Sequence, residues 1–166
     1  MKNVINGLFC TFLFTNVLWY IIFWGSYSSM GNIFIIQKRA IRIMLGLGRR
    51  SSCRGGFKQF DKLTVLSLYI YALMLFAVKN LNIYQTISFV HGTNARQQNK
   101  VHITSVRFSS IQTDVYYSSI KIFNQLPQNT FKYCNNIHTF KALLRDCIVK
   151  NALYSNEEYF LLVIRK

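Results

Sequence analysis

The stretch LTVLSLYIYALMLFAVKN, residues 63–80, indicates the fold class most directly. Nearly every position is apolar, and the segment is long enough for four helical turns. Thr64 can cap the start of this helix, because a Thr hydroxyl at that position accepts a hydrogen bond from an exposed backbone N–H. Lys79 lies near its end, where a positive charge interacts favourably with the helix dipole. The segment therefore predicts a strongly apolar helix.

Further helices are expected on both sides of this segment. The capping and breaking residues that bound them are Gly46 and Gly48 on one side, and Asp114 and Pro127 on the other. Ser155 and Glu158 have the spacing of a capping box. The predicted helical segments are residues 6–23, 32–45, 57–61 and 114–126, one that starts near Asn136, and a terminal turn after Ser155.

Periodicity fails between these two groups of helices. Residues 81–113 contain no acidic residue and include the polar, basic run HGTNARQQNKVHITSVRF, which predicts an extended loop or a short strand pair. The predicted fold is mainly α, an irregular helical bundle of about five to six helices with a long basic loop in the middle. We expect three parts: apolar and basic helices in residues 1–80, the loop in 81–113, and a helical subdomain in 114–166.

The helix expected at residues 32–45 combines apolar and basic positions. On a helical wheel Lys38 and Arg42 share one face, and Arg39 lies at its edge. The opposite face is apolar, and we expect it to be buried. Its members are Ile33, Ile36, Ala40, Ile43 and Leu47.

The charge of the chain is strongly positive and unevenly distributed. Twenty Lys and Arg against five Asp and Glu give a net charge of +15, and no acidic residue occurs before Asp61. A field of this sign attracts polyanions, either nucleic acid or an anionic membrane surface. The candidate nucleic-acid-binding residues are Lys38, Arg39, Arg42, Arg49, Arg50 and Arg54.

The segment GLFCTFLFTNVLWYIIFW, residues 7–24, has two interpretations. It is uncharged and about long enough to cross a bilayer, for which ~20 apolar residues suffice. Thr11, Thr15 and Asn16 interrupt it, however, and the following GSYSSMG offers no convincing signal-peptide cleavage site. A buried helix and a membrane anchor therefore both remain open, and the anchor defines an alternative function as a small basic single-pass membrane protein.

The sequence offers no catalytic or metal-binding constellation. Cys134, His138 and Cys147 lack a fourth ligand, whereas structural zinc takes four. The three aspartates are isolated, and two-metal nucleotidyl transfer needs carboxylates that hold ions ~4 Å apart. Glu157 and Glu158 fit a helix start better than a metal site. We expect no enzyme activity from this chain alone, no cofactor and no metal.

Several segments together resemble a known family. They are IIFWGS (21–26), IFIIQKRAIRIM (33–44), SSCRGGFKQF (51–60), LTVLSLYIY (63–71), TNARQQN (93–99), YYSSIKIFNQLP (116–127) and FKALLRDCIVKNALYSNEEY (140–159). In this order and spacing they resemble the region after the polymerase core of jockey-like non-LTR retrotransposon reverse transcriptases. The likeness covers residues 12–159. The chain departs from the family pattern at Leu66, where a proline is usual.

The resemblance implies a function and a context for the chain. It implies a non-catalytic C-terminal fragment of an RNA-directed DNA polymerase, the thumb and its extension, whose palm domain with the catalytic Asp pair is missing. In the parent protein the basic residues would contact the RNA or DNA backbone of the template–primer without sequence preference. The resemblance also implies an intracellular location, in the nucleus or cytoplasm. A membrane partner and location belong only to the alternative function.

Overall fold

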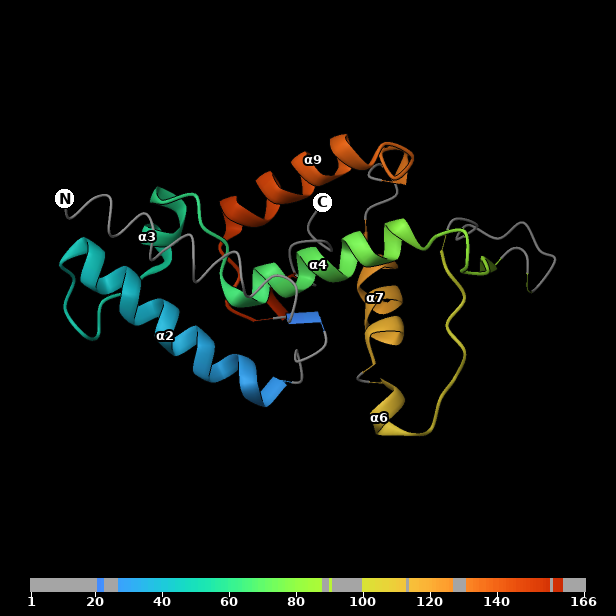
Figure 1. Cartoon of the computed structure of the whole chain (residues 1–166), viewed down its shortest axis with the longest axis horizontal. Helices are drawn as coiled ribbons and strands as arrows, with labels where there is room; N and C mark the ends of the chain where they lie inside the picture. The colour runs from blue at the N-terminus through green and yellow to red at the C-terminus, as the bar shows by residue number, and fades with distance from the viewer. Residues whose placement is uncertain are drawn as a thin grey trace. The chain divides into compact units, whose positions relative to one another are not determined.

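The computed structural model describes residues 21–22, 27–87, 90, 100–112, 114–126, 131–155 and 157–159. Within these ranges the protein is mainly helical, as predicted, with six helices (Figure 1). The predicted helix at residues 6–23 lies almost entirely outside the described residues, apart from Ile21 and Ile22, which are helical. The helices are α2 (Tyr27–Leu45), α3 (Arg54–Gln59), α4 (Val65–Lys79), α6 (Ser109–Gln112), α7 (Val115–Phe123) and α9 (Ile137–Asn151).

The chain divides into two compact units. Unit 1 comprises Met1–Ala72 and Leu144–Tyr159, and unit 2 comprises Leu73–Leu143 and Phe160–Lys166. The divisions fall inside α4 and α9, so each of these helices contributes to both units. The expected parts 1–80, 81–113 and 114–166 remain a prediction about domain organisation.

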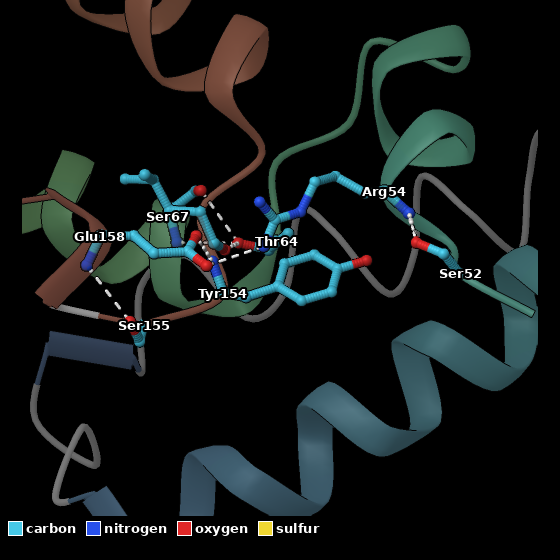
Figure 2. Close-up of polar contacts among 8 residues, drawn as sticks. Ser52, Arg54, Thr64, Ser67, Tyr154, Ser155 and Glu158 are labelled. Carbon is cyan, nitrogen blue, oxygen red and sulfur yellow. Dashed lines mark hydrogen bonds and ion pairs between the residues drawn. The ribbon is translucent and has the colours of Figure 1, made fainter. Parts of the chain in front are cut away.

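The first turn of α4 is capped as the sequence predicts. The Thr64 hydroxyl oxygen accepts a hydrogen bond from the Ser67 N–H at 3.1 Å. The same hydroxyl donates to the Leu153 carbonyl at 2.6 Å, which ties α4 to the segment after α9 (Figure 2). A second N–H of this turn, that of Val65, donates to Gln37 Oε1 on α2 at 2.8 Å. Two buried side chains therefore satisfy backbone donors that the helix start leaves unpaired.

The apolar core of unit 1 gathers around α3 and α4. Phe57, Val65 and Ile70 are fully buried. Phe34 of α2 packs edge-on against Tyr154, with ring centroids 4.9 Å apart. Burial of such side chains contributes roughly 1.5–3 kcal/mol each. Other fully or almost fully buried apolar residues of this unit are Ile41, Ile148 and Leu153.

The prediction for the buried face of α2 is wrong. Ile36 and Ile43 are 52% and 81% exposed. The face that packs into unit 1 instead carries Met30, Gln37 and Ile41, each at most 4% exposed. Both faces carry apolar side chains at helical spacing, so periodicity alone did not distinguish them. The start of α2 also differs, because the helix begins at Tyr27 and continues through Gly31, whereas the sequence predicted a start at residue 32.

Unit 2 holds the middle of the chain. The described part of the predicted loop contains one antiparallel bridge, Thr86 to Val101, and the short helix α6. Asp114 lies at the N-cap of α7, as predicted, although its side chain makes no capping hydrogen bond. Asn124, just after α7, binds both backbone groups of Val101, at 2.9 Å and 2.8 Å. The fully buried residues of this unit include Leu73, Met74, Ile120, Phe123 and Phe140.

Candidate nucleic-acid interface

The basic segment begins where α2 ends. Gly46 has a φ of +64°, the left-handed conformation that glycine adopts without steric cost. The Leu47 N–H donates to the Arg42 carbonyl at 2.8 Å, and the Gly46 N–H donates to the Ile43 carbonyl at 3.3 Å. These two bonds make a Schellman motif, which ends the helix and reverses the chain. The predicted end of this helix near Gly46 is confirmed.

The turn that follows folds back along α2. Arg42 Nε donates to the Ser51 carbonyl at 3.0 Å. One helical turn earlier, the buried Cys53 thiol lies 3.5 Å from the Lys38 carbonyl and donates to it. Arg49 and Arg50 therefore lie on a loop held beside the C-terminal half of α2.

A close helix–helix contact holds the far end of this turn. A Cβ on Gly56 of α3 would lie 2.5 Å from Ile41 Cγ2 and 2.6 Å from Leu45 Cδ1. Only a glycine lets the α3 backbone approach α2 this closely. The segment from Lys38 to Gly56 is thus anchored at both ends and along its length.

The structure brings five of the six predicted site residues onto α2 and this turn, with different exposures. Arg39, Arg49 and Arg50 are exposed, whereas Lys38 and Arg42 are half-buried. The Lys38 ammonium lies over the Phe34 ring, 4.4 Å from its centroid. None of the five forms an ion pair with an acidic residue in the described part of the chain. No described carboxylate therefore neutralises these five charges.

Arg54, the sixth predicted residue, has a different environment. Its guanidinium donates to Glu158 Oε1 at 2.7 Å and lies over the Tyr154 ring, 4.4 Å from the centroid (Figure 2). The other carboxylate oxygen of Glu158 accepts the Tyr154 N–H at 2.9 Å. Burial alone would raise the pKa of Glu158, but these hydrogen bonds and the Arg54 charge hold it below its ordinary value. Glu158 thus offsets the charge of Arg54.

The ion pair between Arg54 and Glu158 was not predicted from the sequence, although the helix cap formed by Ser155 and Glu158 was. The Glu158 N–H donates to the Ser155 hydroxyl at 3.2 Å, so the predicted cap is present. The carboxylate does not return to the Ser155 N–H as a capping box requires, because it binds Tyr154 and Arg54 instead. Arg54 and Glu158 lie 104 residues apart, and no local pattern connects them.

In the described part of the chain, no group of three or more His, Cys, Asp and Glu could hold a metal ion. Burial raises the pKa of the Cys134 thiol to about 11, which disfavours the thiolate that zinc binds. Asp61 is bound to Arg145 at 2.8 Å. The expectations of no enzyme activity and no metal stay predictions.

Comparisons with known proteins leave the family open. No protein-family model, curated protein or solved structure matches this chain. In the described part of the chain, no helix has the length and apolar character needed to cross a bilayer. Most of the apolar segment 7–24 lies outside those residues, so its two interpretations both stand as predictions.

Proposed function

We propose that this chain binds RNA and DNA through their phosphates, with little sequence preference, using Lys38, Arg39, Arg42, Arg49 and Arg50. One observation carries the proposal. A helix and the turn folded against it present five basic side chains, and no acidic residue of the described chain pairs with any of them. Basic side chains that neutralise phosphates give affinity without reading bases.

The arrangement of the turn also supports this function. The bond from Arg42 to Ser51 and the bond from Cys53 to Lys38 hold the turn in place before any ligand binds. Less conformational entropy is then lost when Arg49 and Arg50 contact a phosphate backbone. Arg54 contributes less, since Glu158 already neutralises it.

The experiment compares charge changes inside and outside this surface. Arg49→Gln/Arg50→Gln is the test variant, because both side chains are exposed and no described contact depends on them. Lys141→Gln/Lys150→Gln removes the same charge from α9 and is the matched control. Affinity for duplex DNA, for RNA and for a second, unrelated sequence is measured by fluorescence anisotropy across a salt series.

Each phosphate contact contributes ~0.9 to the slope of log affinity against log salt on duplex DNA. The test variant should therefore flatten the slope by up to ~1.8 and weaken binding equally for all sequences, because two contacts are lost. The control should change the slope much less. Equal effects of the two variants would mean that only the net charge matters, and the proposed surface would then be rejected.

We further propose that the chain is the non-catalytic C-terminal part of a jockey-like retrotransposon reverse transcriptase. The ordered series of family-like segments supports this assignment. Genomic DNA upstream of the Met1 codon should then encode a polymerase palm with adjacent aspartates. The purified chain should give no primer extension with Mg²⁺ or Mn²⁺. Template-dependent product, or an upstream sequence unrelated to a polymerase, would contradict the assignment.

A further inference from the structure

The turn between α2 and α3 carries a serine in a distinctive sequence context. Arg49 and Arg50 stand three and two residues before Ser52. Ser52 is the only serine or threonine of the sequence with arginine at both of these positions. This arrangement is typical of sites modified by basophilic protein kinases, whose substrate grooves carry carboxylates that bind the two guanidinium groups.

The structure leaves all three of these side chains accessible. Arg49, Arg50 and Ser52 are exposed. In the part of the chain that the structure describes, neither arginine pairs with an acidic residue. The Ser52 Oγ accepts the Arg54 N–H at 3.5 Å, a long contact that does not use the hydroxyl proton (Figure 2). Both the hydroxyl and the two charges that a kinase would recognise can therefore be reached from solvent.

The backbone before Ser52 can open without unfolding either neighbouring helix. It lies between the end of α2 at Leu45 and the start of α3 at Arg54. The Ser51 carbonyl accepts hydrogen bonds from Arg42 Nε at 3.0 Å and from the Cys53 thiol at 3.7 Å. The Ser51 N–H donates to the Gly48 carbonyl at 3.0 Å. Kinases bind their substrate segment in an extended conformation, and a short turn held by a few hydrogen bonds near the surface opens locally at low cost.

Two other serines fit this recognition less well. Ser51 is exposed as well, but the arginines stand two and one residues before it. Ser110 has Arg107 three residues before it, but Phe108 stands two residues before it. Ser110 also belongs to α6, which would have to unfold to bind in a kinase groove. Sequence context and position in the fold therefore both favour Ser52.

We propose that Ser52 is a phosphorylation site for a basophilic serine/threonine kinase, and that its phosphorylation weakens nucleic-acid binding. The Ser52 Oγ attacks the γ-phosphorus of ATP that is bound with Mg²⁺ in the kinase. The bond from this phosphorus to the β–γ bridging oxygen breaks, ADP leaves, and the hydroxyl proton passes to a catalytic aspartate of the kinase. The phosphoserine that forms carries a charge of about −1.5 to −2 at neutral pH.

The new negative charge lies within the proposed nucleic-acid surface. Ser52 belongs to the same turn as Arg49 and Arg50, and Arg42 binds the carbonyl of the residue before it. Arginine binds phosphate through paired, charge-assisted hydrogen bonds, so the phosphoserine competes with nucleic-acid phosphates for these cations. This effect rests on the proposed function, whereas the modification itself does not.

The first experiment maps the modification on the full chain. The purified chain is incubated with Mg²⁺, ATP and the catalytic subunit of cyclic-AMP-dependent protein kinase, a basophilic kinase, and tandem mass spectrometry locates the phosphate. Ser52→Ala is the test variant, and Ser51→Ala is the matched control. Arg49→Gln/Arg50→Gln tests recognition of the two arginines, with Lys141→Gln/Lys150→Gln as the control of equal charge.

The wild type and Ser51→Ala should be phosphorylated at Ser52, and Ser52→Ala should not be phosphorylated in this turn. Arg49→Gln/Arg50→Gln should lower kcat/KM of the kinase for the chain at least about tenfold, because two charge-assisted hydrogen bonds to the kinase are lost. The lysine control should change kcat/KM little. Phosphate at Ser51 or Ser110 in place of Ser52, or no phosphate at all, would overturn the proposed site. A rate that is unchanged without the two arginines would overturn the class of kinase.

The second experiment measures the effect on nucleic-acid binding. Affinity for duplex DNA is followed by fluorescence anisotropy across a salt series, before kinase treatment, after it, and after removal of the phosphate with a phosphatase. Phosphorylation should flatten the slope of log affinity against log salt by ~0.9–1.8, because the phosphate neutralises one or two of the cations, and the phosphatase should restore the slope. Kinase-treated Ser52→Ala should bind like the untreated chain.

The two experiments fail in different ways. Equal affinity and slope before and after phosphorylation of Ser52 would overturn the regulation but leave the modification site standing. An untreated chain that does not bind nucleic acid would reject the proposed function and the regulation together. The mapped position of the phosphate would still decide whether Ser52 is the site.

Discussion

Gly56 offers the sharpest test of how the basic turn is held. A Cβ at this position would lie 2.5 Å from Ile41 Cγ2 and 2.6 Å from Leu45 Cδ1. Ile41 is 1% exposed, and its Cγ2 is bonded directly to Cβ, so it has little freedom to withdraw. Overpacking of this kind costs about 1–3 kcal/mol. Replacing a helical glycine with alanine opposes this by up to about 1 kcal/mol.

The neighbouring glycine provides the control for this substitution. Gly55 lies in the same helix, and a Cβ there would meet nothing within 4 Å. Gly55→Ala should therefore stabilise the chain by about 0.5–1 kcal/mol. The free energy of unfolding should be lower in Gly56→Ala than in Gly55→Ala by about 1–3 kcal/mol, the cost of the clash alone. Urea titrations followed by far-UV circular dichroism would measure both.

A second substitution tests the named contact. Leu45→Ala should destabilise the wild-type chain, but it should be less harmful, or even favourable, in Gly56→Ala, because it makes room for the new methyl group. Coupling between contacting residues commonly reaches 0.5 kcal/mol or more. If Gly56→Ala is as stable as Gly55→Ala, α3 does not approach α2 as described. The basic turn would then not be held by a contact between α3 and α2.

Three further predictions concern other described residues. Thr64→Val should cost about 1–3 kcal/mol, because it removes a buried cap and leaves a carbonyl unpaired, whereas Thr64→Ser should largely restore stability in the same urea titrations. Cys134, with its pKa raised to about 11, should react more slowly with a thiol reagent at pH 8 than the exposed Cys147. Equal rates, resolved by mass spectrometry, would contradict its burial. The pKa of Glu158 is lower in the folded than in the unfolded chain, so its stabilising effect is present above its unfolded pKa and is lost as pH falls through the folded value. Glu158→Gln should reduce the acid-dependent part of stability by less than about 1 kcal/mol, since the pair with Arg54 is partly exposed.

Local chemistry predicted most of the described helices and several of their ends, but not α6, which lies in the segment predicted as a loop. Thr64, Gly46 and Asp114 lie at the predicted termini, because capping depends on a few neighbouring residues. The start of α2 was predicted too late. Its first five residues include two Ser and one Gly, which have low helix propensity, and the burial of Met30 outweighs that preference.

The site depended more on contacts between distant parts of the chain. The spacing of apolar residues on α2 allowed two buried faces, and packing around Ile41 and Gln37 selected one of them. The pairing of Arg54 with Glu158 was equally invisible, because charge counts along the first sixty residues do not include an acid from the end of the chain. The sequence showed where the basic residues lie along the chain, but it did not show which of them pair with an acidic residue.

Both described ion pairs of unit 1 involve basic residues other than those of α2 and its turn. Asp61 binds Arg145 and Glu158 binds Arg54, so each of these acids is engaged by a basic residue outside the proposed surface. The five remaining cations of α2 and its turn would repel one another if they stayed close together without a counter-ion. That repulsion is relieved when a polyanion binds, and it is partly relieved by salt in the free protein. The unbound chain should therefore gain stability from moderate salt, and a short oligonucleotide should raise its unfolding midpoint more at low salt than at high salt. A midpoint that is independent of salt, with and without oligonucleotide, would show that these charges are too far apart in space to act as one site.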